Sequence, residues 1–295
     1  MSTATTTRSG ALTDTTWAST HLEDPSVVFL EVDQRAALYD RGHIPGAHCV
    51  DWNTDLQDPI QRDLPNPQQM TQLWSRLGIR DSTTVVFYGD LNNWLAAYGF
   101  WLFRSYGLSN LRLLDGGRQR WIAEEQSPLS RKPAISASAG NVPTPRFDGR
   151  YRADRADAAG AARDGDLIDV RTHQEYTGEW LTEPEYPGEA AHRPGHIPGA
   201  RHVPWDRAID LDGRFKASEE LRGLYPAHEG SPDAPIVTYG RIGERSAHTW
   251  FVLHELLGHP HVSNYDGSWT EWGSMTAMPI QLGHEPGQLG SDFVP

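Results

Sequence analysis

Two stretches of this chain repeat each other closely enough to fix how it can fold. The first copy has RGHIPGA at 41–47, and the second has RPGHIPGA at 193–200. A strand-like run that ends in Tyr-Gly occurs at 85–89 and again at 236–240. An Asp-Gly pair follows each run, within 113–117 in the first copy and within 264–268 in the second. In both copies the tyrosine and the aspartate are 27 residues apart. Several motifs at matched spacing predict two copies of one structural unit.

Within each copy, short apolar runs alternate with helical patterns. In the second copy we expect strands at 167–170, 202–205, 235–239 and 261–265, with helices at 219–224 and 247–257. The first copy shows the same alternation, beginning with VVFLEV at 27–32. Alternating strands and helices predict an α/β fold with two tandem domains, each a parallel sheet flanked by helices.

Composition shifts suggest where the domains begin and end. The first residues are polar, and roughly residues 124–150 are rich in Ser, Pro and Ala with little periodicity. We therefore expect a flexible tail at 1–17, a first domain at 18–125, a linker at 126–150, a second domain at 151–280 and a C-terminal tail at 281–295.

Charge and composition exclude several classes of partner. The formal net charge is −13, which argues against nucleic acid or an anionic membrane as a partner. No run approaches eighteen apolar residues, and the single cysteine, Cys49, cannot form an intramolecular disulfide. The thirteen histidines are scattered, and His254, His259 and His261 lack a carboxylate or thiolate at ligand spacing. We expect a cytoplasmic protein without a metal or cofactor.

The segment YGRIGERS at 239–246 predicts a binding site for an anion. It follows an apolar strand and opens a helix, so it lies where parallel α/β sheets bind ligands. Backbone amides helped by Gly240 and Gly243 can converge on one point, and the helix adds its positive end. Arg241 and Arg245 offer forked donors to an oxyanion. The alternative is that both arginines solvate a surface turn or cap a neighbouring carbonyl.

These residues also carry a family resemblance, which extends over nearly all of residues 20–280. The chain resembles the tandem-domain rhodaneses, the thiosulfate and 3-mercaptopyruvate sulfurtransferases, in both GHIPGA motifs, IDVR at 168–171, DGSWTEWG at 266–273 and YGRIGERSAHTWFV at 239–252. In that family a cysteine in the second domain's loop accepts a sulfane sulfur as a persulfide and passes it to a thiophile. The first domain usually lacks the cysteine. Here Gly240 stands at the family's cysteine position, so the nucleophile is missing.

The resemblance implies a set of ligand-binding residues around that position. The loop matches the family's pattern on both sides of the substitution, and we expect it to contact a small sulfur-containing or carboxylate anion through Arg241, Ile242, Gly243, Glu244, Arg245 and Ser246.

Residues outside the loop are further candidates, each with a structural alternative. His248 could move protons near the anion or be a packed helix residue. Arg171, with Asp169, could brace the site by an ion pair or tie sheet to loop. Asn93 and Trp94 could form a wall facing the second domain, or be interface core. We expect Cys49 to be a small buried hydrophobe rather than a substitute nucleophile.

Three hypotheses for function follow from the altered loop. The first is a sulfurtransferase-like protein in which sulfur transfer is absent or strongly impaired by Gly240. The second is a non-catalytic module that binds an anion or a partner. The third is an enzyme with different chemistry on an anionic substrate held by Arg241 and Arg245, since oxyanion stabilisation can support catalysis without a protein nucleophile.

Overall fold

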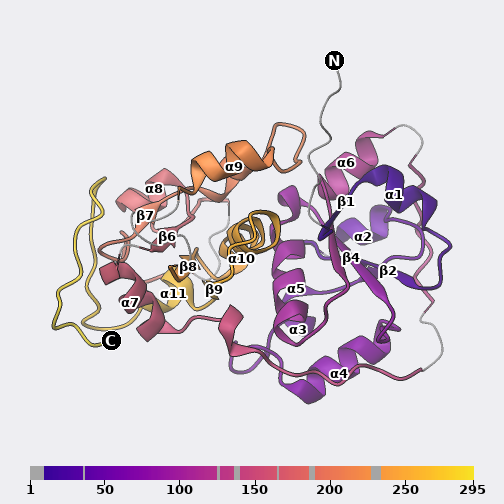
Figure 1. Ribbon diagram of the computed structural model, residues 1–295, viewed down its shortest axis with the longest axis horizontal. Helices are drawn as coiled ribbons and strands as arrows, with labels where there is room; N and C mark the ends of the chain where they lie inside the picture. Colours follow the sequence, from indigo (N-terminus) through magenta and orange to yellow (C-terminus); the bar gives the residue numbers. More distant parts are fainter. Residues whose placement is uncertain are drawn as a thin grey trace. The chain divides into compact units, whose positions relative to one another are not determined.

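The chain folds around two separate parallel sheets (Figure 1). The computed structural model describes residues 10–35, 37–124, 127–135, 140–164, 166–185, 190–226 and 234–295. The first of two units comprises Met1–Phe147 together with Ile209–Ser218, and the second comprises Asp148–Ala208 and Glu219–Pro295. Both sheets are flanked by helices, which confirms the predicted fold class.

The first unit contains a five-stranded parallel sheet in the order β1-β5-β4-β2-β3. Its strands are β1 (Leu12–Thr13), β2 (Val27–Glu31), β3 (His48–Cys49), β4 (Thr84–Tyr88) and β5 (Leu111–Leu114). Its helices are α1 (Thr15–Thr20), α2 (Ala37–Arg41), α3 (Trp52–Asp55), α4 (Pro67–Arg76), η1 (Leu91–Asn93), α5 (Trp94–Ser105) and α6 (Gly117–Ala123).

The second unit contains a four-stranded parallel sheet in the order β7-β6-β8-β9. Its strands are β6 (Leu167–Asp169), β7 (Arg201–His202), β8 (Ile236–Tyr239) and β9 (Val262–Tyr265). Its helices are η2 (Gly149–Tyr151), α7 (Arg155–Asp164), α8 (His173–Thr177), η3 (Trp205–Ala208), α9 (Ser218–Leu224), α10 (Glu244–Phe251), η4 (Val252–Leu256) and α11 (Ser268–Trp272).

The two sheets have one topology, as the sequence repeat predicts. Strands β3, β2, β4 and β5 of the first unit match β7, β6, β8 and β9 of the second in order and direction. The extra strand β1 pairs with β5, and in the second unit a single bridge between Arg152 and Asn264 takes that place. Strand β8 is buried at every residue, which explains its continuous apolar sequence.

The GHIPGA motifs serve one structural purpose in both units. The hydroxyl of Tyr88 accepts a hydrogen bond from the backbone N–H of Ile44 at 3.0 Å, and Tyr239 does the same for Ile197 at 3.1 Å. A tyrosine from the preceding helix stacks on the histidine of each motif, Tyr39 on His43 and Tyr176 on His196. The repeated GHIPGA motif therefore holds its loop against β4 in the first unit and against β8 in the second.

A stretch that follows the last helix closes each unit, and we call it the closing strap (residues 127–132 and 279–286). In the first unit His43 and Ser130 exchange both backbone hydrogen bonds, at 2.9 and 2.8 Å. In the second unit His196 and Gln281 do the same, at 3.0 Å each. An indole also donates to a proline carbonyl in both straps, Trp121 to Pro128 and Trp272 to Pro279.

Two described stretches that the sequence assigned to the tails are structured. Residues 12–17, expected to belong to a tail, form β1 and the start of α1, and the carboxylate of Asp14 accepts the backbone N–H of Trp17 at 2.7 Å. At the other end, Gln281 pairs with the GHIPGA loop, and Leu289 is buried. Both stretches are polar enough to resemble tails, but a few backbone hydrogen bonds hold them in place.

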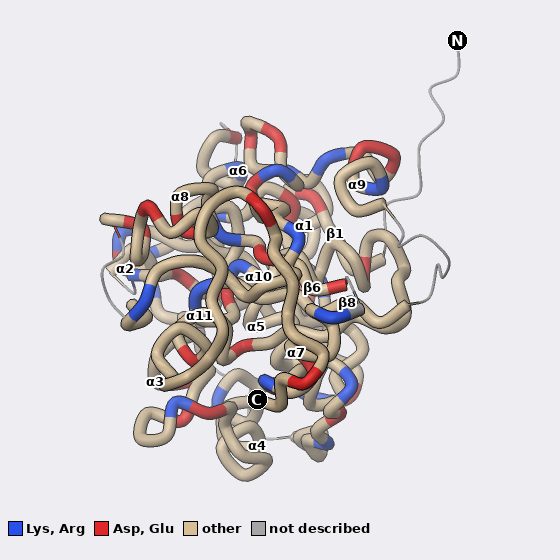
Figure 2. The backbone as a smooth tube through the Cα atoms, turned by 90° about the vertical axis from the view of Figure 1, so that its left-hand side faces the viewer, with Lys and Arg blue, Asp and Glu red and all other residues tan. Residues whose placement is uncertain are grey.

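Charged residues of both signs are distributed along the whole chain. Figure 2 shows Lys and Arg interspersed with Asp and Glu. The sequence has 26 Lys and Arg against 39 Asp and Glu, which gives the net charge of −13. Among the residues that the structure describes, none of the helices combines the length and apolar character needed to span a membrane.

Candidate functional site

The loop from Gly240 to Gly243 joins β8 to α10 and takes its shape from one obligatory glycine. Gly243 caps the helix in the left-handed conformation, with φ 96°. A Cβ added there would lie 2.8 Å from both Cα and Cβ of Asp266, so only glycine fits. The side-chain amide of Asn264 donates to the Gly243 carbonyl at 3.1 Å. The sequence thus places the loop where strand ends and helix begins.

Helix α11 anchors the first half of the loop. The hydroxyl of Ser268 accepts the backbone N–H of Gly240 at 3.0 Å. The backbone N–H groups of Trp269 and Thr270 donate to the carbonyls of Gly240 and Arg241, both at 3.0 Å. The DGSW motif thereby fixes position 240, which explains why the repeat preserves its spacing from the tyrosine of β8.

Position 240 has room for a side chain. A Cβ built on Gly240 would lie 3.5 Å from the backbone N of Ser246, 3.5 Å from Cγ2 of Val170 and 3.6 Å from Cβ of Arg245. These are ordinary van der Waals contacts, and the backbone there is outside the left-handed region. Neither sterics nor backbone conformation requires glycine at this position. A side chain at 240 would begin directly above the N-terminal turn of α10.

Arg241 and Glu244 form an ion pair inside the loop. Nη2 of Arg241 lies 3.3 Å from Oε1 of Glu244. The other carboxylate oxygen of Glu244 accepts the backbone N–H of Ile242 at 3.2 Å. The hydroxyl of Ser246 donates to the Gly243 carbonyl at 3.1 Å. Glu244 and Ser246 therefore satisfy the loop's own polar groups.

Arg245 is fully buried and engaged by carboxylates. Its Nη1 and Nη2 donate to the two oxygens of Glu175 at 2.8 and 3.0 Å, a bidentate pair. Nη1 also lies 3.5 Å from Oε1 of Glu183. Burial alone would raise the pKa of Glu175, but the adjacent Arg245 brings it down to about 2.

Among the described residues, Arg241, Arg245 and the carboxylates that pair with them carry a net negative charge when all are ionised. Two guanidiniums, of Arg241 and Arg245, face three carboxylates, of Glu175, Glu183 and Glu244. The sequence drew attention to the arginines and overlooked Glu175 and Glu183. Glu175 had a detectable signal, since Thr172 and Glu175 form a capping box at the start of α8. Glu183 had none.

His248 lies in the interior, one turn into α10. It is fully buried and its ring meets the indole of Trp205 edge to face, with 5.2 Å between centroids. Burial lowers its pKa to about 3, so the imidazole is neutral at ordinary pH. Proton transfer near pH 7 needs a pKa near that value, so this environment favours the packed helix residue over a general acid or base.

Arg171 braces the end of β6. Its Nε and Nη2 donate to the carboxylate of Asp169 at 3.0 and 2.6 Å, which is the ion pair expected from the sequence. Nη2 also donates to the Gly195 carbonyl at 2.8 Å, and the guanidinium lies 4.6 Å from the ring centroid of Trp269. Arg171 thus joins β6, the GHIPGA loop and α11 by one side chain.

In the first unit, Asn93 and Trp94 stand at the corresponding turn between β4 and α5. Asn93 has φ 68° and caps the helix, as Gly243 does in the second unit. Its amide accepts the backbone N–H of Gly89 at 3.0 Å and donates to the Leu114 carbonyl at 2.7 Å. Asn93 and Trp94 are both buried. These contacts give Asn93 a structural role within its own unit.

Cys49 ends β3 in the first unit and is partly buried. Burial, followed by the nearby Glu31 and Asp33 carboxylates, raises its thiol pKa to about 12. The thiolate is the reactive form, so this cysteine is a weak nucleophile at neutral pH.

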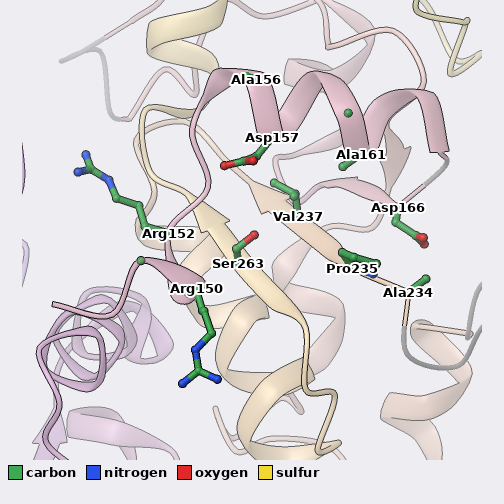
Figure 3. Close-up of a pocket in the computed structure, with 12 residues that line it drawn as sticks. Arg150, Arg152, Ala156, Asp157, Ala161, Asp166, Ala234, Pro235, Val237 and Ser263 are labelled. Carbon is green, nitrogen blue, oxygen red and sulfur yellow. The ribbon is translucent and has the colours of Figure 1, made fainter.

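A hollow of about 550 Å³ lies at the opposite end of the second sheet (Figure 3). It is lined by residues of η2 and α7, by residues at the amino ends of β6 and β8, and by Ser263 of β9. Arg150 and Arg152 point away from its centre, toward their ion-pair partners Asp148 and Asp266. Among the described residues no group of three or more His, Cys, Asp or Glu is arranged to hold a metal ion.

The architecture is that of a duplicated α/β protein with a strand–loop–helix site at the carboxyl end of its second sheet. The family model for the rhodanese-like domain matches residues 14–124 and 153–275, and the chain belongs to that family.

Similar proteins span the same length as this chain. "Sulfur carrier protein TtuD" of Thermus thermophilus is 50% identical over 279 residues, covering 93% of this chain and 97% of that protein. A Mycolicibacterium smegmatis protein named "Putative thiosulfate sulfurtransferase" is 47% identical over 280 residues, covering 94% and 99%. The agreement over whole chains extends the family assignment to both units.

Solved structures reproduce the arrangement at lower identity. The crystal structure of YnjE has a TM-score of 0.80 at 25% identity, covering 94% of this chain and 69% of that one. The anaerobic ergothioneine biosynthesis enzyme from Chlorobium limicola, solved with trimethyl histidine, has a TM-score of 0.80 at 24% identity, covering 93% and 71%. The second likeness shows the fold alone.

Proposed function

We propose that this protein is a sulfurtransferase-like protein that binds a small sulfur-containing anion at the loop 240–245 but transfers sulfur poorly or not at all by the persulfide route. The observation that supports the proposal is the state of position 240. The loop is held by Ser268, Trp269 and Gly243, while the residue at its start has no side chain to carry a sulfur atom.

The geometry of the loop supports anion binding in spite of the carboxylates. The first amides of a helix lack intrahelical acceptors and carry partial positive charge. A ligand atom above Gly240 would lie close to the backbone N of Ser246, in the N-terminal turn of α10. The relatives' names, a sulfur carrier and a thiosulfate sulfurtransferase, support a sulfur compound as the ligand.

A paired assay tests the proposal. The chain and its Gly240→Cys variant are compared with thiosulfate as donor and cyanide as acceptor. We expect the chain to be slower than the variant by roughly 10²–10⁴-fold, because the chain lacks the nucleophile. The variant should fold normally, because a Cβ at 240 makes only ordinary contacts.

Two control variants test whether any activity depends on a thiol at position 240. Gly240→Ala supplies the Cβ without sulfur, and Cys49→Ser removes the other cysteine. Turnover by the unmodified chain that Cys49→Ser abolishes would overturn the role of position 240. If neither the chain nor Gly240→Cys transfers sulfur, although both are folded and bind thiosulfate, chemistry other than persulfide transfer would be favoured.

A further inference from the structure

Arg241, Arg245, Glu175, Glu183 and Glu244 form the loop's ion-pair cluster, and Glu183 is its surplus carboxylate because the other two glutamates pair with the two arginines. Arg245 and Glu175 form one pair, and Arg241 and Glu244 form another. Among the described residues, Glu183 adds a third carboxylate to these two arginines, while Arg171, the other cation that acts on Glu175, is itself paired with Asp169. A buried carboxylate needs compensation by charge or hydrogen bonds, so the unmatched one is the easiest to protonate or displace.

Among the described contacts of the two Nη atoms of Arg245 with carboxylates, the contact with Glu183 is the longest, and Nε lies 3.8 Å from Glu244. The two bonds from Arg245 to Glu175 measure 2.8 and 3.0 Å and are parallel, whereas Glu183 lies 3.5 Å from Nη1. Nη1 carries two hydrogens, one directed to each carboxylate. An oxyanion that displaced Glu183 would gain one hydrogen of Nη1 without breaking the bidentate pair.

Solvent reaches this contact at Glu183. The side chain of Glu183 is 19% exposed, against 1% for Glu175 and 1% for Glu244. Burial, together with the nearby carboxylates of Glu175 and Glu244, raises the pKa of Glu183, while Arg245 and Arg241 oppose the shift. Of the three carboxylates, Glu183 is therefore the one that solvent and a ligand can reach most easily.

We propose that Glu183 is a specificity-determining residue that competes with the sulfur donor for Arg245, so that the loop favours donors with one negative charge over donors with two. This inference rests on the proposed anion binding at the same loop. A second charge on the donor meets the surplus carboxylate at close range, where like charges repel most strongly. A singly charged donor meets less of that repulsion.

Two donors that share a sulfonyl-bound sulfur and differ in charge test this inference. Thiosulfate is a dianion and methanethiosulfonate a monoanion at neutral pH. Their binding to the unmodified chain, Glu183→Gln and Glu179→Gln is measured by titration calorimetry between pH 5.5 and 8. Glu179 is an exposed glutamate four residues earlier, so its substitution is the matched control.

We expect Glu183→Gln to tighten thiosulfate binding about three- to tenfold at pH 8, with a smaller gain for methanethiosulfonate, because one repulsive charge is removed from a partly exposed site. The gain should shrink as the pH falls, because burial raises the pKa of Glu183 and a protonated Glu183 no longer repels the donor. In the Gly240→Cys background the same substitution should lower the KM for thiosulfate and leave kcat unchanged.

The outcomes distinguish this inference from the function on which it rests. Thiosulfate binding that is equal in the chain, Glu183→Gln and Glu179→Gln would overturn the role of Glu183 and keep the anion site. Equal gains for both donors would overturn the charge discrimination. No binding of either donor to any of the three proteins would overturn the anion site and the role of Glu183 together.

Discussion

Asp33, beyond the end of β2, is an acid buried beside other acids. It is 6% exposed, and its Oδ1 accepts the backbone N–H of Asp90 at 2.7 Å. The nearby cation, Arg118, is paired with Glu31 at 2.6 Å instead. Burial, followed by Glu31, raises the pKa of Asp33 from its ordinary 3.8 to about 8. At neutral pH this side chain is therefore largely protonated.

Replacing Asp33 by asparagine should stabilise the first unit at alkaline pH. The folded state keeps a proton on Asp33 up to about pH 8, whereas the unfolded chain releases it above about pH 4. Unfolding is therefore favoured increasingly as pH rises through that window. Thermal melts should show a Tm gain for Asp33→Asn at pH 8 of roughly 2–4 °C per kcal/mol recovered, and a clearly smaller gain at pH 5.

The exposed Asp81→Asn variant serves as the control for that measurement. A gain of equal size at pH 5 and pH 8 would show that the effect of Asp33→Asn comes from packing or hydrogen bonding rather than from its charge.

At the scale of elements, the loop between β8 and α10 contains two glycines with opposite requirements. Gly243→Ala should destabilise the second unit by about 1–3 kcal/mol, because φ is 96° and the new Cβ would lie 2.8 Å from Asp266. Gly240→Ala should be neutral or stabilising by up to about 1 kcal/mol, since its Cβ fits and the unfolded chain loses freedom. Chemical denaturation measures both.

That pair of variants is its own control, since both exchange Gly for Ala within four residues. Equal destabilisation at the two positions would mean that the backbone at 240 is more constrained than its contacts indicate.

The sequence predicted the loop's position but not its charge pairing. Matched spacing, apolar strands and two glycines are local patterns, and they sufficed to place the loop between β8 and α10. The partners of Arg245 are not local: Glu175 lies 70 residues away and Glu183 lies 62 away. Which carboxylate approaches a given arginine depends on packing between elements, and no short motif encodes that.

The equivalence of two other ion pairs, Arg118 with Glu31 and Arg171 with Asp169, was also not visible in the sequence. Each unit buries one guanidinium beside an acid at the end of its first central strand. Arg118, from α6, pairs with Glu31 and donates to the Gly42 carbonyl, while Arg171, next to β6, pairs with Asp169 and donates to the Gly195 carbonyl. The two arginines occupy different positions in the repeat. Aligning the two copies therefore does not reveal that both arginines have the same structural role.

At the scale of the whole molecule, each unit is closed by the closing strap that follows its last helix. We expect Ser130→Pro to destabilise the first unit and Gln281→Pro the second, by about 1–3 kcal/mol each, because each change removes a backbone donor to the GHIPGA loop. Differential scanning calorimetry should resolve which transition shifts in each variant.

The two variants act as controls for each other. A shift of both transitions in either variant would show that the straps do not act on separate units. The first strap also lies within residues 126–150, which the sequence presented as a linker, so part of that stretch belongs to the fold of the first unit.

The ten residues Ile209–Ser218 belong to the first unit although second-unit sequence surrounds them. Within that unit the backbone N–H of Phe215 donates to the carboxylate of Asp115 at 2.9 Å, and Phe215 is buried. On the ribosome, the first unit thus lacks a part until translation has passed residue 218, well into the second copy. The first unit is therefore completed only after residues 148–208 of the second unit have been made, so the two units are not synthesised strictly one after the other.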